Sequence, residues 1–190
     1  MAPVVPSTVS TSQALFSFFI VSSLVAAAAG VHVHGTHQPG TEKTTQLHFY
    51  FQEISAGPNP SVMRVAQANT TDASPTSFGA VFVADNPLTE GPELTSRLLG
   101  RAQGVYSAAS REEYALMMAL NLVFVEGEYN GSALTMMGRN PIFHAAREMP
   151  IVGGSGHFRL ARGYALLRTI RLDSKSGVVT VEYNVTVIHP

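Results

Sequence analysis

The sequence predicts a single all-β domain of eight antiparallel strands, for three reasons. Apolar and polar residues alternate with a period of two in several short segments, turn-forming sequences separate most of these segments, and no segment has a convincing amphipathic helical period. The chain has 190 residues, which suits one domain with a substantial core. Periodicity alone leaves open whether the strands stack as a sandwich or close into a barrel around one small ligand.

The N-terminal region predicts export. Residues 14–29 form an apolar run that is short for a membrane span and ends in small residues suited to cleavage. We therefore predict a secretory signal peptide over residues 1–29 and an extracellular protein. No Lys or Arg precedes Lys43, so a membrane anchor is the alternative. Three N-x-S/T sequons fit the same compartment and predict glycosylation at Asn69, Asn130 and Asn184.

The domain is expected over residues 46–190, after a polar arm. Residues 30–45 contain Gly and Pro and lack an apolar period, which is typical of a flexible arm. Apolar and polar residues then alternate over residues 47–52, and Glu53 falls on the apolar face of this first strand. The remaining strands are predicted over residues 62–68, 78–84, 98–107, 116–126, 133–138, 163–172 and 178–188.

Two segments predict tight hairpins. Asn-Gly tolerates the positive φ angles of a type I′ turn, so residues 129–132 (YNGS) predict one hairpin. Residues 174–177 predict a second hairpin. Residues 114–123 have helix-forming Ala, Leu and Met, but the Val-Phe-Val that follows favours a strand. The glycine-rich residues 153–156 lack a following Gly-Lys-Ser/Thr, so we predict a tight turn and not a phosphate-binding loop.

Composition excludes several functions. The formal net charge is −1 and the basic residues are scattered, which argues against nucleic acid or an anionic membrane surface as partner. Cysteine is absent, so there are no disulfides, thiolate metal sites or cysteine nucleophiles. No hydrolase motif is present. Charged residues make up 13% and hydrophobic residues 45% of the chain, which favours a sheet buried on both faces or an oligomer.

One histidine cluster is a candidate copper site. His32, His34 and His37 lie in the arm, and cleavage after Ala29 would place His32 third in the mature chain. Histidines in an arm are usually solvated, so we predict no metal site and no cofactor.

A set of polar residues within otherwise apolar segments forms the candidate site. Each taken singly is expected to make a structural hydrogen bond or to face outward, because a buried charge is costly unless it is paired. As a set they could line the inside of a barrel. They are Glu53, Arg101, Tyr106, Asn140, Arg147 and Thr169.

Seven sequence blocks occur in an order that identifies a family. They are FYFQE (49–53), DNPLT (85–89), GRAQGVY (100–106), YNGS (129–132), MGRN (137–140), REM (147–149) and VGGSGHFRLARG (152–163). From about Leu47 to its C-terminus the chain resembles the plant dirigent proteins.

The resemblance implies a fold and a function. The fold is an eight-stranded antiparallel β-barrel with the shape of allene oxide cyclase and the lipocalins, usually trimeric, with a dimer as the alternative. The implied protein is secreted to the apoplast, binds phenoxy radicals or quinone methides, and controls the stereochemistry of their coupling or cyclisation. A separate laccase or peroxidase supplies the radicals, and no cofactor is implied.

The resemblance also assigns site residues. Glu53 matches the acidic residue that ends the first strand, normally preceded by His where this chain has Gln52. Tyr106 matches a pocket tyrosine, Arg147 a pocket arginine and Thr169 a residue of the barrel interior. We predict Glu53 and Arg147 as catalytic residues. The predicted substrate-binding residues are Tyr106, Asn140, Thr169 and Arg101.

Two positions depart from the family pattern. Asn140 stands where lignan-forming members carry an aspartate, and Ala108 where some members have another aromatic residue. Asparagine can donate and accept hydrogen bonds but cannot exchange a proton near neutral pH, so any acid–base role would fall to Glu53 alone. These departures weaken the expectation of one lignan-forming activity and leave the barrel unaffected.

Three functions remain open at this level. The first is stereoselective coupling of phenylpropanoid radicals to lignans, with Tyr106 stacking on the ring, Arg147 pairing with a phenolate oxygen and Glu53 transferring protons. The second is a cyclase that acts on a quinone methide without an oxidase. The third is a non-catalytic binder of an apolar metabolite in cell-wall defence.

Overall fold

Residues 41–190 are described by the structure, a computed structural model, and they form nine β-strands and three short 3-10 helices. The predicted leader and residues 30–40 of the predicted arm, including the histidine cluster, lie outside the described residues. Within the described part, no helix is long and apolar enough to cross a membrane. The elements are β1 (Lys43–Ile54), β2 (Val62–Ala66), η1 (Thr71–Ala73), β3 (Val81–Thr89), β4 (Leu98–Ala108), β5 (Ala115–Phe124), η2 (Gly127–Tyr129), β6 (Ala133–Pro141), β7 (Arg147–Ser155), η3 (Gly156–Phe158), β8 (Arg162–Asp173) and β9 (Val178–His189).

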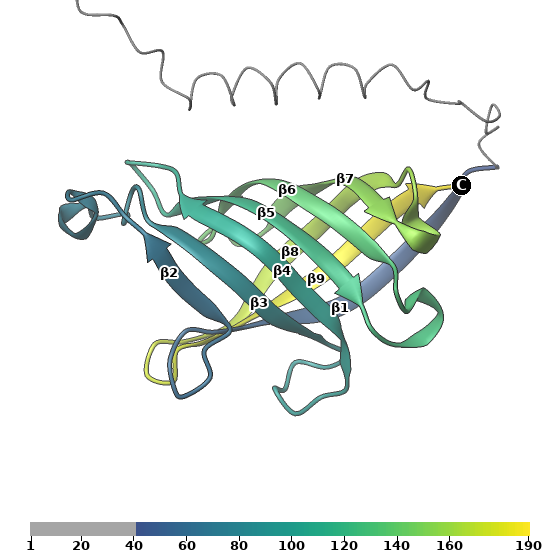
Figure 1. Ribbon diagram of the computed structural model, residues 1–190, viewed down its shortest axis with the longest axis horizontal. Helices are drawn as coiled ribbons and strands as arrows, with labels where there is room; N and C mark the ends of the chain where they lie inside the picture. Colours follow the sequence, from purple (N-terminus) through teal and green to yellow (C-terminus); the bar gives the residue numbers. More distant parts are fainter. Residues whose placement is uncertain (1–40) are drawn as a thin grey trace, which may run out of the picture. The chain divides into compact units, whose positions relative to one another are not determined.

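The strands form one antiparallel sheet that closes on itself (Figure 1). Their order is β1-β9-β8-β7-β6-β5-β4-β3-β2, and a pairing of β1 with β3 closes eight of them into a barrel. β2 lies outside this ring and pairs with β3. The predicted eight-stranded antiparallel barrel is confirmed, and the sandwich alternative is wrong.

The ring closes through few backbone pairs. Two residues of β1 pair with β3, Tyr50 with Thr89 and Phe51 with Leu88. By contrast, β1 pairs with β9 along its whole length, from Lys43 to Ile54. The junction of β1 and β3 is therefore the shortest seam of the barrel.

Gln52 reinforces this seam from outside the barrel. Its amide nitrogen donates to the Thr89 hydroxyl at 3.0 Å and to the Pro92 carbonyl at 3.1 Å. Its Oε1 accepts from the Thr180 hydroxyl of β9 at 2.8 Å. The side chain is fully buried, so one satisfied amide ties β1 to β3, to the β3–β4 connection and to β9.

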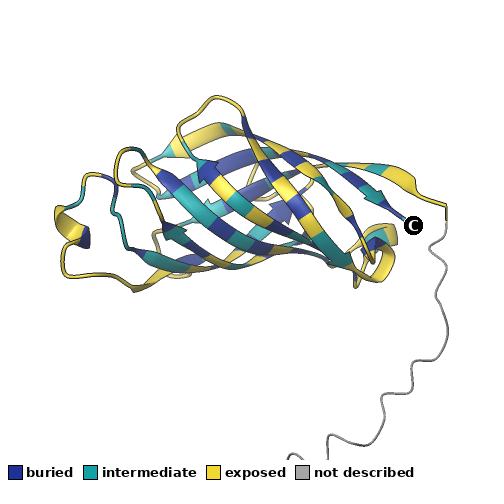
Figure 2. Ribbon diagram, turned by 90° about the horizontal axis from the view of Figure 1, so that it is seen from above, coloured by how far each residue is buried: buried dark blue, intermediate teal, exposed yellow. Residues whose placement is uncertain are grey.

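Alternate side chains fill the interior. Buried residues alternate with more exposed ones along β5 and β9 (Figure 2), which is the pattern expected of strands that face a core on one side. Tyr183 stacks on Phe49 at 5.5 Å and on Phe51 at 5.6 Å between ring centroids. At the end of the barrel near η2 and η3, Tyr129 and Phe158 pack with their centroids 4.8 Å apart.

One strand of the barrel was missed in the sequence. β7 alternates buried and exposed residues, but its Arg147, Glu148 and Pro150 hide the apolar period. Residues 153–155, predicted as a tight turn, extend this strand and pair with residues 133–135 of β6. The predicted count of eight was right for the barrel because β2, which was counted, is not part of the ring.

Two strands also have other boundaries than the sequence predicted. Residues 43–45, assigned to the arm, belong to β1 and pair with residues 187–189 of β9. β3 covers residues 81–89 and not 78–84, because its polar second half pairs with β4 through the backbone. In both places backbone pairing with a neighbour extends a strand beyond its apolar pattern.

The two predicted turns differ in outcome. Asn130 has φ −51° and ψ 131°, Gly131 has φ 78°, and the Ser132 amide donates to the Tyr129 carbonyl at 2.9 Å. This is a type II turn, so type I′ was wrong; η2 precedes the turn, which therefore does not join two paired strands directly. The hairpin at residues 174–177 is confirmed, and residues 115–124 form strand β5 as predicted.

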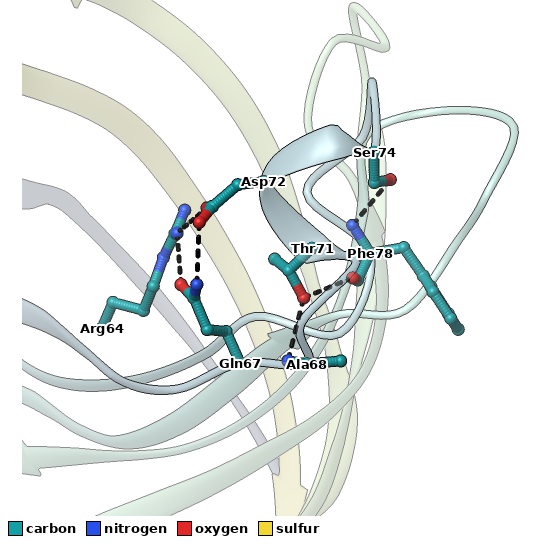
Figure 3. A network of polar contacts seen from close by, with 7 residues as sticks. All are labelled: Arg64, Gln67, Ala68, Thr71, Asp72, Ser74 and Phe78. Atoms are coloured by element: carbon teal, nitrogen blue, oxygen red, sulfur yellow. Dashed lines mark hydrogen bonds and ion pairs between the residues drawn. The ribbon is translucent and has the colours of Figure 1, made fainter.

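Polar side chains order the connection between β2 and β3 (Figure 3). Arg64 donates to Gln67 at 2.8 Å and to Asp72 at 3.1 Å. The Thr71 hydroxyl accepts from the Ala68 amide and donates to the Phe78 carbonyl, both at 3.0 Å. These contacts build the turn of η1 without an apolar core of its own.

We expect Gly104→Ala to destabilise the barrel. A Cβ at this position of β4 would overlap the carbonyl oxygen of Ala119 on β5, and backbone atoms of a paired strand cannot move aside cheaply. The expected loss is about 3 kcal/mol of unfolding free energy, measured by chemical denaturation. The matched control is Gly153→Ala, where a Cβ meets no atom within 4 Å and the change should stay within about 0.5 kcal/mol. Equal effects at the two glycines would contradict the prediction.

Candidate functional site

A cavity of about 100 Å³ opens inside one end of the barrel. It lies where β1, β6 and β8 end and β5, β7 and β9 begin, so six strands and the β6–β7 connection contribute to its wall. Most of the wall is apolar, with a few polar groups, as is common for small-molecule pockets. The lining residues are Phe51, Glu53, Leu116, Met118, Asn140, Ile142, Phe143, Arg147, Leu167, Thr169, Leu172, Val179, Val181 and Tyr183.

Glu53 and Tyr106 form a hydrogen-bonded pair at this cavity. The Tyr106 hydroxyl donates to Glu53 Oε2 at 2.8 Å, and the Tyr106 ring is held by stacking on Phe82 at 5.1 Å. Burial raises the pKa of Glu53, and the hydrogen bond from Tyr106 opposes part of this rise. Burial and the neighbouring Glu53 carboxylate raise the pKa of Tyr106, which therefore stays protonated as a donor. Glu53 is thus a carboxyl group prepared for proton transfer.

Arg147 is a buried cation with unused hydrogen-bonding capacity. Its side chain is 4% exposed, and its Nη1 donates to the Ile142 carbonyl at 2.6 Å. Its Nε and Nη2 are buried and have no partner within the described chain. Burial lowers its pKa, although an arginine remains charged. Such a cation is costly to bury, and an anionic oxygen of a ligand would offset that cost.

Asn140 offers an acceptor in the same cavity wall. Its Nδ2 donates to the Met118 sulfur at 3.0 Å, which is a weak acceptor. Its Oδ1 is buried without a partner within residues 41–190. A ligand hydroxyl could donate to this oxygen, so Asn140 can bind and orient a ligand although it cannot transfer a proton.

The structure brings five of the six predicted residues to one place. Glu53, Asn140, Arg147 and Thr169 line the cavity, and Tyr106 reaches it through Glu53. Arg101 does not join them.

Arg101 sits elsewhere because its neighbours on β4, Gly100 and Ala102, are buried and the alternation of the strand turns it outward. Its guanidinium donates to Asp85 Oδ1 at 2.5 Å and to the Asp85 carbonyl at 2.6 Å.

Ten of the fourteen lining residues were not named from the sequence, among them Tyr183, Met118 and Phe143. Tyr183 is fully buried. Burial and the Glu53 carboxylate raise its pKa, and the Arg147 guanidinium opposes part of this rise. Its inward position on β9 could have been found from the alternation of that strand. Met118 and Phe143 carry no such signal, because methionine is common in any core and Phe143 lies in a connection without a period.

The three sequons have exposed asparagines in different settings. Asn69 precedes η1, Asn130 lies in the type II turn after η2, and Asn184 lies in the middle of β9. Among residues 41–190, no group of three or more His, Asp or Glu side chains is arranged to hold a metal ion.

A family model described as Dirigent-like protein matches residues 44–188, which is most of the chain. The chain belongs to the dirigent family. This confirms the resemblance that the seven sequence blocks indicated, and the matched region coincides with the barrel from β1 to β9.

Similar proteins include both general dirigent proteins and synthases. Dirigent protein 23 of Arabidopsis thaliana is 44% identical over 180 residues, covering 94% of this chain and 96% of that protein. Pterocarpan synthase 1 of Glycyrrhiza echinata is 47% identical over 149 residues, covering 78% and 79%. The solved structure of the pterocarpan synthase dirigent protein GePTS1 matches with a TM-score of 0.74 and 46% identity, covering 81% of this chain and 89% of that one.

We expect Glu53→Gln to make stability less dependent on pH. Because the folded pKa of Glu53 is raised above its ordinary value of 4.5, the folded state binds the proton more tightly than the unfolded state. The contribution of Glu53 to stability should then be greatest below pH 4.5 and be lost as the pH rises through the folded pKa. Gln stays neutral and can still accept from Tyr106, so the variant should lack this fall. Thermal unfolding from pH 4 to pH 8 measures the difference, and parallel curves for the two proteins would refute it.

Proposed function

We propose that this dirigent protein binds a phenolic quinone methide and directs its stereoselective ring closure. The observation that carries the proposal is the buried Arg147, whose Nε and Nη2 lack partners in the described chain, beside the cavity that also holds Glu53. A quinone methide gains negative charge on its oxygen when a nucleophile adds to its exocyclic carbon. A fixed, buried cation stabilises that developing charge.

The reaction is an isomerisation in which each group has one task. An internal hydroxyl of the ligand adds to the exocyclic carbon, and a C–O bond forms as the quinone carbonyl becomes a phenolate. Glu53, as carboxylate, accepts the hydroxyl proton and returns it to the phenolate oxygen, which Arg147 stabilises meanwhile. Asn140 accepts a hydrogen bond from a ligand hydroxyl and thereby fixes which face is attacked. Atoms and electrons balance without an oxidant.

The size of the cavity supports one ligand at a time. A cavity of about 150 Å³ accepts benzene, and this one measures about 100 Å³ before a ligand enters. A single aromatic ring already requires some opening, and two radicals would require more. Two relatives named pterocarpan synthase, 46% and 47% identical to this chain, are consistent with synthesis of a ring compound.

Oxidase-dependent coupling of phenylpropanoid radicals to lignans is the second candidate. Membership of the dirigent family favours it, and the stacked rings of Phe51 and Tyr183 give the wall a flat aromatic face on which a radical could lie. In this function an external laccase or peroxidase makes the radicals, and the protein supplies orientation.

A two-arm assay with chiral chromatography decides between the candidates. The first arm uses a stabilised para-quinone methide that carries an internal phenolic hydroxyl, and the second uses coniferyl alcohol with a non-selective laccase. We expect an enantiomeric excess in the first arm without laccase. We also expect Glu53→Gln and Arg147→Met each to lower kcat by about 10²-fold or more.

The other outcomes are equally informative. An excess in the laccase arm alone would replace the cyclase by the coupling function. Racemic products in both arms, with saturable binding of the quinone methide, would overturn both and favour the non-catalytic binder.

We also propose a homo-oligomer, a trimer by family resemblance, that forms through an apolar row on the outer face. Val83, Val105, Ala119 and Met137 pair in register across β3, β4, β5 and β6, and Met63 of β2 extends the row. On the side toward η2, the next outward row is polar and bonded within itself, with Gln103 donating to Asp85 and Thr135 to Asn121. A continuous apolar row favours burial against another copy.

Val105→Glu is expected to yield monomers. Val105 lies in the middle of the row and is 47% exposed, so a charge there would be buried in the oligomer. Size-exclusion chromatography with light scattering measures the mass, with Leu94→Glu, an exposed leucine in the β3–β4 connection, as control. A monomeric unaltered protein, or an intact oligomer in Val105→Glu, would contradict the proposed interface.

Secretion to the apoplast and glycosylation at Asn69, Asn130 and Asn184 remain part of the proposal. The exposed asparagine side chains support the glycosylation sites, and the apolar residues 14–29 support export. Mass spectrometry of the secreted protein before and after glycosidase treatment identifies both the mature N-terminus and the occupied sites.

A further inference from the structure

The backbone ladder between β6 and β7 ends before the cavity end of the barrel. The ladder joins residues 133–136 of β6 to residues 151–155 of β7 and stops there. Beyond this point β6 continues to pair with β5, and the first half of β7 pairs with β8. Asn140 and Arg147 therefore lie on neighbouring strands that no backbone ladder joins at this end within the described chain, although a Cβ on Gly138 would still meet the Pro150 ring.

The connection between β6 and β7 packs against the connection between β4 and β5. Residues 142–146 join β6 to β7, and the Ile142 amide donates to the Tyr114 carbonyl at 3.1 Å. The rings of Phe143 and Tyr114 meet edge to face with centroids 5.3 Å apart. Phe143 lines the cavity although it is 65% exposed, so this connection forms part of the cavity's outer wall.

Glu113 fastens the same connection with both carboxylate oxygens. Oε1 accepts from the Arg139 guanidinium on β6, and Oε2 is hydrogen-bonded to His144 Nε2 at 2.9 Å. Arg139, with His144 adding to it, lowers the pKa of Glu113. Its own backbone is anchored, because the Ala115 amide donates to the Glu113 carbonyl at 2.8 Å. Glu113 thus bridges the end of β6 and the connection from a fixed point.

The connection in turn holds the site arginine. The Ile142 carbonyl is the acceptor of Arg147 Nη1, and the other two guanidinium nitrogens have no partner among residues 41–190. Any shift of residues 142–146 would therefore move the one hydrogen bond that orients Arg147.

We propose that Glu113, which does not line the cavity, is a positioning residue that sets Arg147 for the reaction by clamping residues 142–146 through Arg139 and His144. The inference rests on the proposed role of Arg147 in ring closure. Because the cavity must enlarge before an aromatic ring enters, the same clamp sets how readily the connection opens to admit one.

The test compares Glu113→Ala and Glu113→Gln with Glu112→Ala, which removes the adjacent exposed carboxylate. The first readout needs no substrate: phenylglyoxal modifies accessible arginines, and peptide mapping reports the rate at Arg147. Loss of one partly exposed ion pair and one hydrogen bond should raise that rate about threefold to tenfold in Glu113→Ala. Glu113→Gln should give a smaller rise, since its one amide oxygen can still accept, and Glu112→Ala should match the unaltered protein.

The second readout is catalytic and uses the quinone methide assay. Glu113→Ala should lower kcat/KM by a similar factor in the unaltered background and should have no further effect in an Arg147→Met background, because a positioning residue acts through its target. The third readout is amide hydrogen exchange, which should quicken in residues 142–147 and remain unchanged elsewhere in the barrel.

Three outcomes would overturn the proposal. They are an unchanged Arg147 modification rate in Glu113→Ala, faster exchange spread over the whole barrel, or additive losses of kcat/KM in the double variant. If the unaltered protein shows no turnover, the proposed function fails, while the modification rate and the exchange pattern still decide whether Glu113 positions Arg147.

Discussion

The closure of the sheet is the constraint on which the rest of the structure depends. β1 meets β3 through two residue pairs, and the buried Gln52 amide ties this seam to β9 and to the β3–β4 connection. Its neighbour Glu53 points the other way, into the cavity. Since successive side chains of a strand face opposite sides, sealing the barrel outside and placing a carboxyl group inside are consequences of the same local register.

The buried polar groups of the site lower the stability of the folded protein, and the long strand ladders around the site offset this loss. Arg147, Asn140 and Glu53 each bury a polar group that is charged, partly unpartnered or both. Groups of this kind usually disfavour folding, and here three of them line one cavity. The long ladders on either side of the cavity, between β5 and β6 and between β8 and β9, hold the backbone that carries these side chains.

In the cavity wall, the paired strands hold the site residues and the β6–β7 connection covers the opening between them. Asn140 is fixed by its ladder to β5 and Arg147 by its ladder to β8, so the two groups sit on rigid strands. Where the ladder between β6 and β7 stops, surface contacts hold the connection that joins these strands, including the Glu113–Arg139 ion pair and the Glu113–His144 hydrogen bond. Exposed ion pairs are weak, which suits a segment that must yield to a ligand and then return.

The sequence by itself determined the all-β class, most strand positions, the hairpin at residues 174–177 and the family, because alternation and motif order are local properties of the chain. It also named five residues that meet at the cavity. Only the tertiary structure decided that the sheet closes through β1 and β3, that β2 lies outside the ring and that Arg101 faces outward. The same holds for β7, whose charged residues and proline hide its period, and for the clamp at Glu113. Each of these depends on which strands become neighbours and where a ladder stops, and that pairing is made between residues far apart in the chain, where side-chain periodicity carries no information.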